Sequence, residues 1–274
     1  MILTWLYVPG DRPDVVVKAL RAGADAVIVD LEDAVSASRK EYARAATVEL
    51  LGSPHQVPVH VRVNALDSPW GGADLTALGR LGGLAGLRLP KISAPEQIAC
   101  VAERTGGAVA LYALLESALG VERAYDIARA HPALRGLSLG EADLRADLGV
   151  TAEAGLDWPR SRVVVAARAA GLAPPAQSVF PDIRDLEALA ASCARGRSLG
   201  FLGRAAIHPR QLPVIERAYL PGPAEVTAAE EIVAAARRTP GALALPDGRF
   251  VDPAMLAGAE RVVALARRSV PVPS

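Results

Sequence analysis

Short β-branched runs alternate with longer stretches of helical spacing along the first 220 or so residues of the chain. The pattern predicts strands over residues 4–8, 26–30, 57–63, 86–90, 108–116, 134–140, 176–180 and 198–207. It predicts helices near 13–23, 38–51, 72–82, 94–105, 119–131, 158–171, 183–196 and 209–219. Eight alternating strand–helix units are typical of an α/β fold, a TIM (β/α)8 barrel. An open doubly wound sheet is disfavoured because no G-x-G-x-x-G follows the first strand.

The pattern changes after about residue 220. Turn prolines introduce "AEVTAAEEIVAAARR", which predicts an amphipathic helix with Thr227 as N-cap and Glu230 three residues later. An Asp-Gly turn at 247–248 and a last helix after Pro253 follow. We therefore expect a catalytic barrel over residues 1–220 and a C-terminal helical extension over 221–274, which packs on a barrel end or on a neighbouring subunit.

Composition narrows the class of protein. The 274 residues are 51% hydrophobic, and 30 basic residues balance 30 acidic ones without a long basic run, which argues against nucleic acid as a partner. Cys100 and Cys193 lie in helical stretches, and we expect buried free thiols in a reducing compartment. Since no apolar stretch is long enough to span a bilayer and the start lacks the features of a signal peptide, the sequence predicts a cytoplasmic protein without a membrane partner.

Polar residues gather where the predicted strands end, which is where barrel enzymes build their active sites. They are Arg12, Glu32, Asp33, Arg62, Asn64, Lys91, Glu116, Glu141, Asp143 and His208. Any one of them is explained as a solvated loop residue, and His208 suits a structural hydrogen bond. Their coincidence over six strand ends favours a functional site.

Glu116 and Asp143 each follow an apolar run, so both carboxylates are expected at the same mouth. Carboxylates that lie close together in a partly dry site repel one another unless a cation joins them. Oxygen ligands without thiolates or clustered histidines suit Mg²⁺. The spacing alone leaves an alternative open, in which Glu116 caps the next helix and Asp143 pairs with Arg145.

Seven motifs together resemble one family: "LYVPGDRPDVVVKAL", "GADAVIVDLEDAV", "VRVNAL", "GLRLPKI", "LLESALGV", "LGEADLRADLG" and "LGFLGRAAIHPRQL". This is the HpcH/HpaI aldolase and citrate lyase family, in particular its citrate lyase β-subunit-like branch, with malyl-CoA and citramalyl-CoA lyases nearby. The resemblance covers residue 6 to about 219, and "DGRFVDPAMLAGAERV" is similar to the branch's C-terminal segment.

The resemblance implies a Mg²⁺-dependent lyase, usually a homotrimer or hexamer. Such enzymes make or break the carbon–carbon bond between a thioester enolate, such as that of acetyl-CoA, and a 2-oxo acid. Malyl-, citramalyl- and citryl-CoA are the implied substrates. Two alternatives stay open: a citrate lyase β subunit that acts on an acyl-carrier-protein thioester within a complex, and a pyruvate-dependent HpcH/HpaI aldolase.

The resemblance also implies roles for individual residues. Glu116 and Asp143 become the metal ligands, and Arg62 binds the oxo acid and stabilises the enolate oxygen. Asp252, carried into a neighbouring subunit's site, is the expected base. The remaining implied residues surround these: Arg12, Lys18 and Lys91 hold the acid or the CoA phosphates, and Glu32 and Asp33 hold metal-bound waters or Arg62.

One segment departs from the family pattern. Around "PPAQSVFPD" an aspartate is expected near Ser178, where this chain has Gln177 and Ser178. The identity of the oxo acid (glyoxylate, pyruvate or oxaloacetate) therefore stays open.

Overall fold

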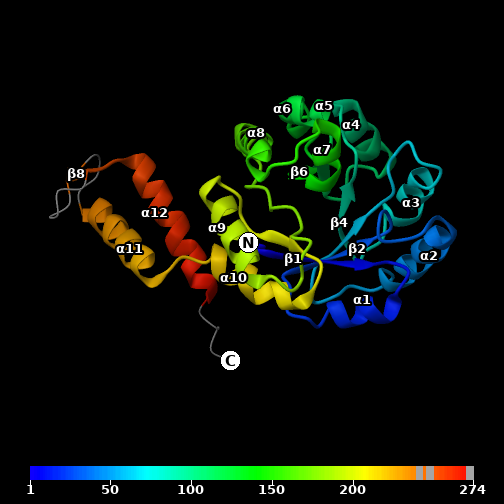
Figure 1. The fold of residues 1–274 in the computed structure, drawn as a ribbon, viewed down its shortest axis with the longest axis horizontal. Helices are drawn as coiled ribbons and strands as arrows, with labels where there is room; N and C mark the ends of the chain where they lie inside the picture. Colours follow the sequence, from blue (N-terminus) through cyan, green and yellow to red (C-terminus); the bar gives the residue numbers. More distant parts are fainter. Residues whose placement is uncertain (239–242, 245–249, 270–274) are drawn as a thin grey trace. The chain divides into compact units, whose positions relative to one another are not determined.

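The computed structural model describes residues 1–238, 243–244 and 250–269. The chain forms two compact units, one of residues 2–216 and one of Met1 with residues 217–274. Figure 1 shows helices and strands alternating along the first of them.

The larger unit contains a curled, wholly parallel sheet of seven strands in the order β6-β5-β4-β3-β2-β1-β7 (Figure 1). Sequential order with parallel pairing requires a crossover connection after each strand, as in a TIM barrel. The prediction of eight barrel strands holds in part, because the sheet has seven strands among the described residues and β6 and β7 are its two ends. The strands are β1 (Thr4–Pro9), β2 (Ala26–Asp30), β3 (Val59–Arg62), β4 (Leu84–Leu89), β5 (Leu111–Leu115), β6 (Leu134–Leu139) and β7 (Arg204–Ala206).

The predicted strand over 176–180 is present only as a single bridge between Gln177 and Arg204. Prolines explain this, because Pro174, Pro175 and Pro181 around it lack the N–H that a ladder needs. The strand predicted over 198–207 is also shorter than expected. Its first residues complete a helix and then turn before β7 begins at Arg204.

Helices connect the strands at most of the predicted places. They are α1 (Pro13–Ala19), α2 (Lys40–Leu50), α3 (Gly71–Leu78), α4 (Pro95–Arg104), α5 (Ala118–Glu122), α6 (Ala124–Ala128), α7 (Glu141–Leu148), α8 (Asp157–Ala169), α9 (Leu186–Ser198) and α10 (Leu212–Tyr219). Short 3₁₀ turns flank four of the chain's helices: Ala37–Arg39, Glu153–Leu156, Pro209–Gln211 and Arg267–Ser269.

Two helices differ from the prediction. The single helix expected over 119–131 is divided at Arg123 into α5 and α6, and α7 was not predicted at all. With eight residues and Leu144 as its buried apolar side chain, α7 is too short and too polar to show a helical repeat in the sequence.

The barrel interior below the strand ends is filled by aromatic rings. Trp5, His60 and Tyr112 pack edge to face, with ring centroids 4.9 to 6.1 Å apart. Every residue of β2 is buried, as its unbroken apolar run predicts for a strand covered on both faces. Burial holds His60 neutral and lowers its pKa to about 3.

The smaller unit contains α11 (Pro223–Arg238), α12 (Pro253–Ala266) and an antiparallel pair of β8 (Leu243–Ala244) with β9 (Phe250–Val251). The expectation for Thr227 is wrong, because α11 begins at Pro223 and the Thr227 hydroxyl donates to the Pro223 carbonyl from inside the helix. The Asp-Gly turn at 247–248 lies outside the described residues.

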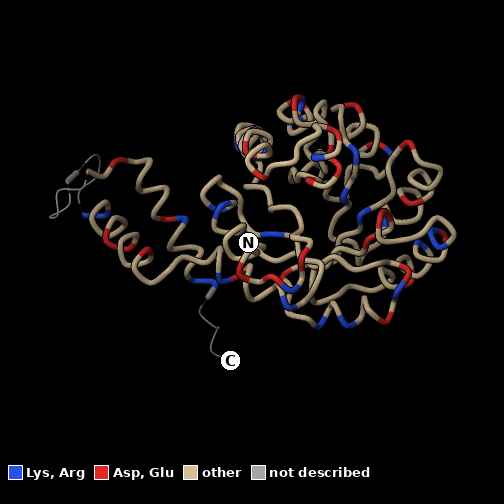
Figure 2. The backbone as a smooth tube through the Cα atoms, viewed as in Figure 1, with Lys and Arg blue, Asp and Glu red and all other residues tan. Residues whose placement is uncertain are grey.

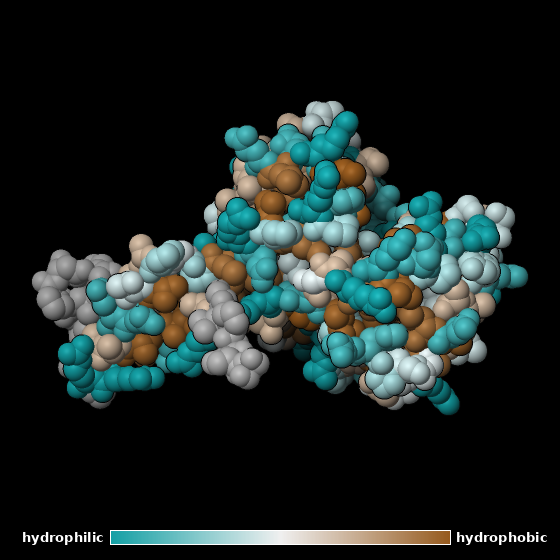
Figure 3. All heavy atoms as spheres, turned by 90° about the horizontal axis from the view of Figure 1, so that it is seen from below, coloured by the Kyte–Doolittle hydropathy of each residue, from teal (hydrophilic) through white to brown (hydrophobic). Residues whose placement is uncertain are grey.

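Charges of both signs are interspersed along the chain (Figure 2), in keeping with the balanced composition. Apolar patches separated by hydrophilic side chains lie on one face (Figure 3), and exposed apolar side chains include Leu119, Trp158 and Val165. No helix among the described residues has the length and apolarity needed to cross a bilayer. Both cysteines are free, but Cys100 is exposed on α4, so the prediction of burial holds for Cys193 alone.

Candidate active site

Three carboxylates surround the guanidinium of Arg62 where β2 and β3 end. Asp30, its register partner, accepts two hydrogen bonds, 2.8 Å from Nε and 2.6 Å from Nη2. Glu32 and Asp33 lie 3.1 and 3.2 Å from Nη1. Burial opposes the charge, but the hydrogen bonding and charge of Asp30 outweigh it and raise the pKa of Arg62.

The loop after β2 is held rigidly from both sides. The Asp30 carboxylate also accepts from the backbone N–H groups of Glu32 and Ala34, at 2.9 and 3.0 Å. The buried Lys40 donates through Nζ to the carbonyls of Leu31 and Glu32, at 2.8 and 2.7 Å. The direction in which Glu32 points is therefore set by the backbone as well as by Arg62.

Glu116, directly after β5, is a buried carboxylate with little compensation. It is 5% exposed, and its Oε2 accepts no hydrogen bond from the described residues. Burial raises its pKa to about 8, and repulsion from Glu32 and Asp143 adds to the shift. Burial likewise raises the pKa of Glu32 to about 7, although Arg62 opposes the shift. Several carboxyl groups thus lie close together in a partly dry space, and Glu116 forms no ion pair with a basic residue among the described ones.

The structural alternatives for Glu116 and Asp143 are wrong. Ser117 caps α5 by accepting from the N–H of Gly120 at 3.1 Å, so Glu116 is not the cap. Arg145 pairs with Glu153 and not with Asp143. Neither carboxylate therefore has the structural role that the alternative gave it.

Gly140 allows Glu116 to lie where it does. A Cβ atom on Gly140 would come within 2.3 Å of Glu116 Cγ, which no side chain tolerates. The N–H of Gly140 donates to the Leu115 carbonyl at 3.1 Å, so β6 ends against β5 and α7 starts beside Glu116. The first turn of α7 carries Asp143.

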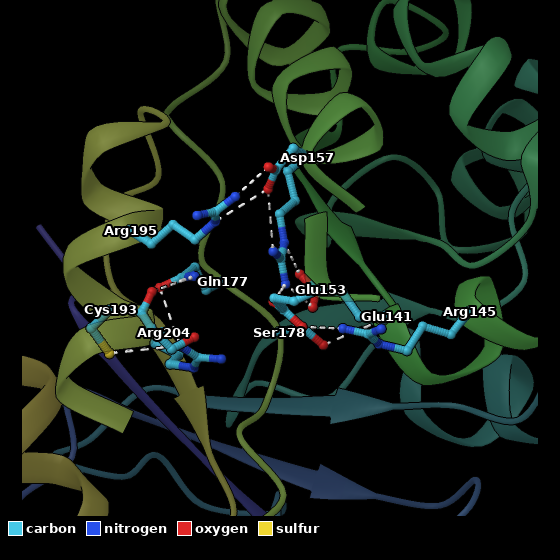
Figure 4. Close-up of polar contacts among 11 residues, drawn as sticks. Glu141, Arg145, Glu153, Asp157, Gln177, Ser178, Cys193, Arg195 and Arg204 are labelled. Atoms are coloured by element: carbon cyan, nitrogen blue, oxygen red, sulfur yellow. Dashed lines mark hydrogen bonds and ion pairs between the residues drawn. The ribbon is translucent and has the colours of Figure 1, made fainter. Parts of the chain in front are cut away.

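A buried ion-pair network anchors α7 to α8. Arg160 is 2% exposed and donates to both oxygens of Glu141, at 2.8 and 2.6 Å, and to Glu153 at 2.5 Å. Figure 4 shows Glu141, Glu153 and Asp157 lying close together there. Ser178, at the position where the family pattern predicts an aspartate, accepts from the Glu141 N–H at 3.4 Å. The helix that carries Asp143 is therefore fixed by charge as well as by packing.

A cavity of about 450 Å³, here named the mouth cavity, lies at the carboxyl ends of the strands, and Asp30, Arg62 and Glu116 line it while Glu32 does not. Its lining combines acidic, basic and hydroxyl groups with apolar walls. The polar and aromatic residues that line it include Trp5, Tyr7, Asp30, Asp33, Arg62, Arg88, Glu116, Ser138, Glu141, Asp143, Gln177 and Ser178.

Arg88 on β4 was missed by the sequence reasoning. It is 3% exposed, and no Asp or Glu of the described residues lies within ion-pair distance. Its guanidinium lies 4.3 Å from the centre of the Trp5 ring and 3.5 Å from Ser138 Oγ. Cation–π contacts contribute about 0.5–2 kcal/mol, less than the several kcal/mol that burying a charge costs. Burial accordingly lowers the pKa of Arg88. The sequence signal that could have identified Arg88 is a single basic residue inside the apolar run "GLRLP".

The structure does not bring all predicted binding residues to the cavity. Arg12 and Lys18 are exposed around α1 and do not line it, and Lys18 lies 3.7 Å from Asp14. Lys91 is closer, with Nζ 3.8 Å from Glu32 Oε1 and a left-handed backbone (φ 56°) that turns the chain after β4. The predicted contacts of Arg12, Lys18 and Lys91 with substrate stay predictions.

Two other residues of the predicted set cap helices. Asp252 lies in the smaller unit and caps α12 by accepting from the Met255 N–H at 2.8 Å. His208 Nδ1 accepts from the Arg210 N–H at 3.1 Å, the structural hydrogen bond that the sequence suggested. Because Asp252 caps α12 through one carboxylate oxygen, its second oxygen can have a further role.

Known proteins resemble this chain along most of its length. A family model described as HpcH/HpaI aldolase/citrate lyase matches residues 3–209. The (3S)-malyl-CoA thioesterase of Cereibacter sphaeroides (strain ATCC 17029 / ATH 2.4.9) is 37% identical over 260 residues, 90% of this chain and 88% of the relative. Citrate lyase subunit beta of Escherichia coli (strain K12) is 34% identical over 266 residues, 90% of this chain and 87% of the relative.

Solved structures agree with these relatives. Protein CitE from Mycobacterium tuberculosis, in complex with magnesium, acetoacetate and coenzyme A, superposes with a TM-score of 0.82 at 32% identity, over 97% of this chain and 98% of that one. The citrate lyase beta subunit from the same organism, complexed with oxaloacetate and magnesium, gives a TM-score of 0.70 at 33% identity, over 80% and 96%.

The raised pKa of Glu116 predicts a pH-dependent stability in protein freed of divalent ions by EDTA. Because the folded protein retains a proton on Glu116 up to about pH 8, and an unfolded Glu releases it near pH 4.3, stability is lost as the pH rises between these values. Glu116→Gln removes that loss. In thermal unfolding, we expect the Glu116→Gln variant to have a melting temperature roughly 3–10 °C above that of the wild-type protein at pH 9. At pH 4 the two melting temperatures should be nearly the same. An equal effect at both pH values would contradict the assignment.

The anchoring of α7 predicts that Arg160→Met destabilises the fold by about 3–5 kcal/mol, because two carboxylates lose their buried partner. Arg168→Met on the exposed side of the same helix is the matched control, with an expected loss within about 1 kcal/mol. Urea unfolding measures both. Similar losses in the two variants would show that the network does not stabilise α7.

Proposed function

Because the chain belongs to the HpcH/HpaI aldolase/citrate lyase family, we propose that it is a Mg²⁺-dependent carbon–carbon lyase. It reversibly cleaves a 3-hydroxyacyl-CoA thioester of the malyl-, citramalyl- or citryl-CoA type into acetyl-CoA and a 2-oxo acid. The observation that carries the proposal is the buried Oε2 of Glu116, which has no hydrogen-bond partner among the described residues; Glu116 lines the same cavity as Asp143 and Arg62.

The residues present fit a magnesium ion. Glu116 and Asp143 would hold it. Burial raises the pKa of Glu116 and repulsion from Glu32 and Asp143 adds to the shift, and a divalent cation beside the carboxylates would offset both. The described residues contain no cluster of three or more His, Cys, Asp or Glu side chains placed as a full metal shell. This suits Mg²⁺, which keeps several waters and binds through one or two carboxylates plus substrate oxygens.

When bound, magnesium would chelate a 2-oxo acid and polarise its keto group. The chain's own residues provide the rest. Arg62, which Asp30 holds in place through two hydrogen bonds, presents its charge to the developing enolate oxygen, a role in which one lost donor costs about 10²–10³ in rate. Glu32 and Asp33 hold Arg62 and the waters around the ion.

Asp252 is the proposed base, which removes the 3-hydroxyl proton in cleavage or the thioester α-proton in condensation. We assign residues 1–220 to the catalytic barrel and 221–274 to a segment that packs on a neighbouring subunit of a homotrimer or hexamer and delivers Asp252 there. The alternative citrate lyase β subunit, which acts on an acyl-carrier-protein thioester, is favoured by the similarity to that subunit from Escherichia coli. Activity on free CoA thioesters decides between them.

The proposal predicts that the purified protein cleaves at least one of malyl-, citramalyl- and citryl-CoA with Mg²⁺ and none of them with EDTA. Glu116→Gln and Asp143→Asn should each lower kcat/KM by about 10³-fold, or ~4 kcal/mol of transition-state stabilisation. Calorimetry should show that both lose Mg²⁺ affinity.

Asp126→Asn, which removes an exposed carboxylate of α6, is the control for both measurements. Product analysis separates the lyase from a thioesterase: acetyl-CoA with an oxo acid in the first case, free CoA with the hydroxy acid in the second. Full turnover in EDTA would refute the metal-dependent mechanism.

For Asp252 the sharp substitution is Asp252→Ser, because serine preserves the helix cap but lacks a carboxylate. We expect a loss of about 10²–10⁴ in kcat, the usual contribution of a general base, with unchanged stability. Asp252→Ala should lose as much activity and, in addition, ~1 kcal/mol of stability.

Mixing subunits tests where Asp252 acts. Asp252→Ser and Glu116→Gln subunits, each inactive alone, should regain part of the activity when they are dissociated and reassembled together, because some sites then combine an intact barrel with an intact segment. Reassembly into the native oligomer without any recovery would place Asp252 outside the neighbour's site.

A further inference from the structure

The mouth cavity contains one arginine that carboxylates neutralise and one that they do not. Arg62 and Arg88 are register partners on β3 and β4, and both line the cavity. Asp30, Glu32 and Asp33 surround Arg62 within 2.6 to 3.2 Å. Among the described residues, Arg88 has no such partner, although only 3% of it is exposed. A buried positive charge is therefore left open towards the cavity.

Two hydroxyl groups line the same cavity as this charge. The buried Nε of Arg88 has no hydrogen-bond partner among the described residues, and Nη1 lies 3.5 Å from the hydroxyl of Ser138. The Tyr7 phenol lines the same cavity and feels the charges of Arg88 and Arg62. Burial raises the pKa of Tyr7, so its O–H stays protonated and can donate. A guanidinium and two hydroxyls form a donor set suited to an oxyanion.

Aromatic rings prevent Arg88 from moving away from the cavity. Its guanidinium lies 4.3 Å from the centroid of the Trp5 ring and 5.3 Å from that of Tyr112. His60, packed edge to face against both rings, is neutral and offers no compensating charge. A planar carboxylate matches the fork of a fixed guanidinium through two parallel hydrogen bonds.

We propose that Arg88, with Ser138 and Tyr7, binds a second carboxylate of the substrate and so selects a dicarboxylic 2-oxo acid over glyoxylate or pyruvate. The choice of oxo acid rests on the proposed lyase function. Glyoxylate, pyruvate and oxaloacetate differ in the group on the keto carbon: hydrogen, methyl or carboxymethyl. Once the common carboxylate and keto oxygen lie beside Glu116 and Asp143, this third group is the one left to reach Arg88.

Binding of malate and lactate tests the subsite without turnover. Both offer a carboxylate with a neighbouring hydroxyl, and only malate has a second carboxylate. In titration calorimetry with Mg²⁺, the wild-type protein should bind malate at least about tenfold more tightly than lactate, as expected for a charge-assisted hydrogen-bonded pair. Arg88→Met, which keeps an unbranched side chain in this apolar setting but removes the guanidinium, should abolish the difference and leave lactate binding unchanged.

Ser138→Ala gives a second measurement that removes one donor without removing the charge. It should narrow the difference by about two- to fivefold, and its small change in volume keeps the fold. Equal affinity of wild-type protein for malate and lactate overturns the proposal. So does a loss in Arg88→Met that is the same for both ligands, because Arg88 then acts through the fold alone.

Activity separates a failure of this proposal from a failure of the proposed function. Arg88→Met should lower kcat/KM for citryl-CoA by about 10- to 100-fold and leave malyl-CoA cleavage unchanged. If the wild-type protein cleaves no CoA thioester, the lyase function fails, while the malate–lactate difference still decides whether Arg88 forms a carboxylate site. If it cleaves malyl-CoA best and Arg88→Met does not change that preference, the subsite fails and the lyase function stands.

Discussion

The double hydrogen bond between Arg62 and Asp30 is the interaction on which the mouth of the barrel depends. It joins the ends of β2 and β3 in a buried setting, where a buried ion pair is favourable only if its hydrogen-bond geometry is as good as this one. Asp30 then fixes the following loop through two backbone N–H groups, which brings Glu32 and Asp33 to the same guanidinium. Across the cavity, burial raises the pKa of Glu116 to about 8, and the charge of Arg62, which three other carboxylates already surround, opposes that shift only in part.

The fold followed from the sequence wherever burial decides the pattern. β2 is apolar along its length because both faces are covered, and its bounds are those predicted. The prediction failed where local chemistry overrides composition: "AQSVF" reads as a strand, but the prolines around it reduce it to one bridge. α7 was not predicted because the spacing of apolar residues identifies a helix only over about three turns, and α7 has eight residues.

The site was predictable in part for a related reason. Residues just past a buried strand are placed by the strand itself, so Glu32, Asp33, Arg62, Glu116 and Asp143 were found from position and motif. Lys40, Arg88 and Arg160 were not, because each belongs to an element and its partners are set by how that element packs, not by a local motif. Arg160 meets Glu141 19 residues earlier, and nothing local in "DWPRSRVV" predicts that meeting. Only the packing of α8 against α7 and β6 makes it visible.

Among the described residues, Glu116 and Asp143 at the strand ends and Arg88 deeper in the cavity form no ion pair, and their charges are opposite in sign. On the proposed function, Glu116 and Asp143 need a cation at the strand ends, and Arg88 needs an anion at its end of the same space. A magnesium ion without a dicarboxylate would neutralise Glu116 and Asp143 but would leave Arg88 buried without an opposite charge. A dicarboxylate without magnesium would neutralise Arg88 but would add to the repulsion around Glu116. A magnesium–dicarboxylate pair supplies both and carries no net charge of its own, so the cavity that is costly when empty of ligand becomes matched at both ends. Binding energy from the second carboxylate would thus help to hold the metal, which couples the choice of oxo acid to the assembly of the site.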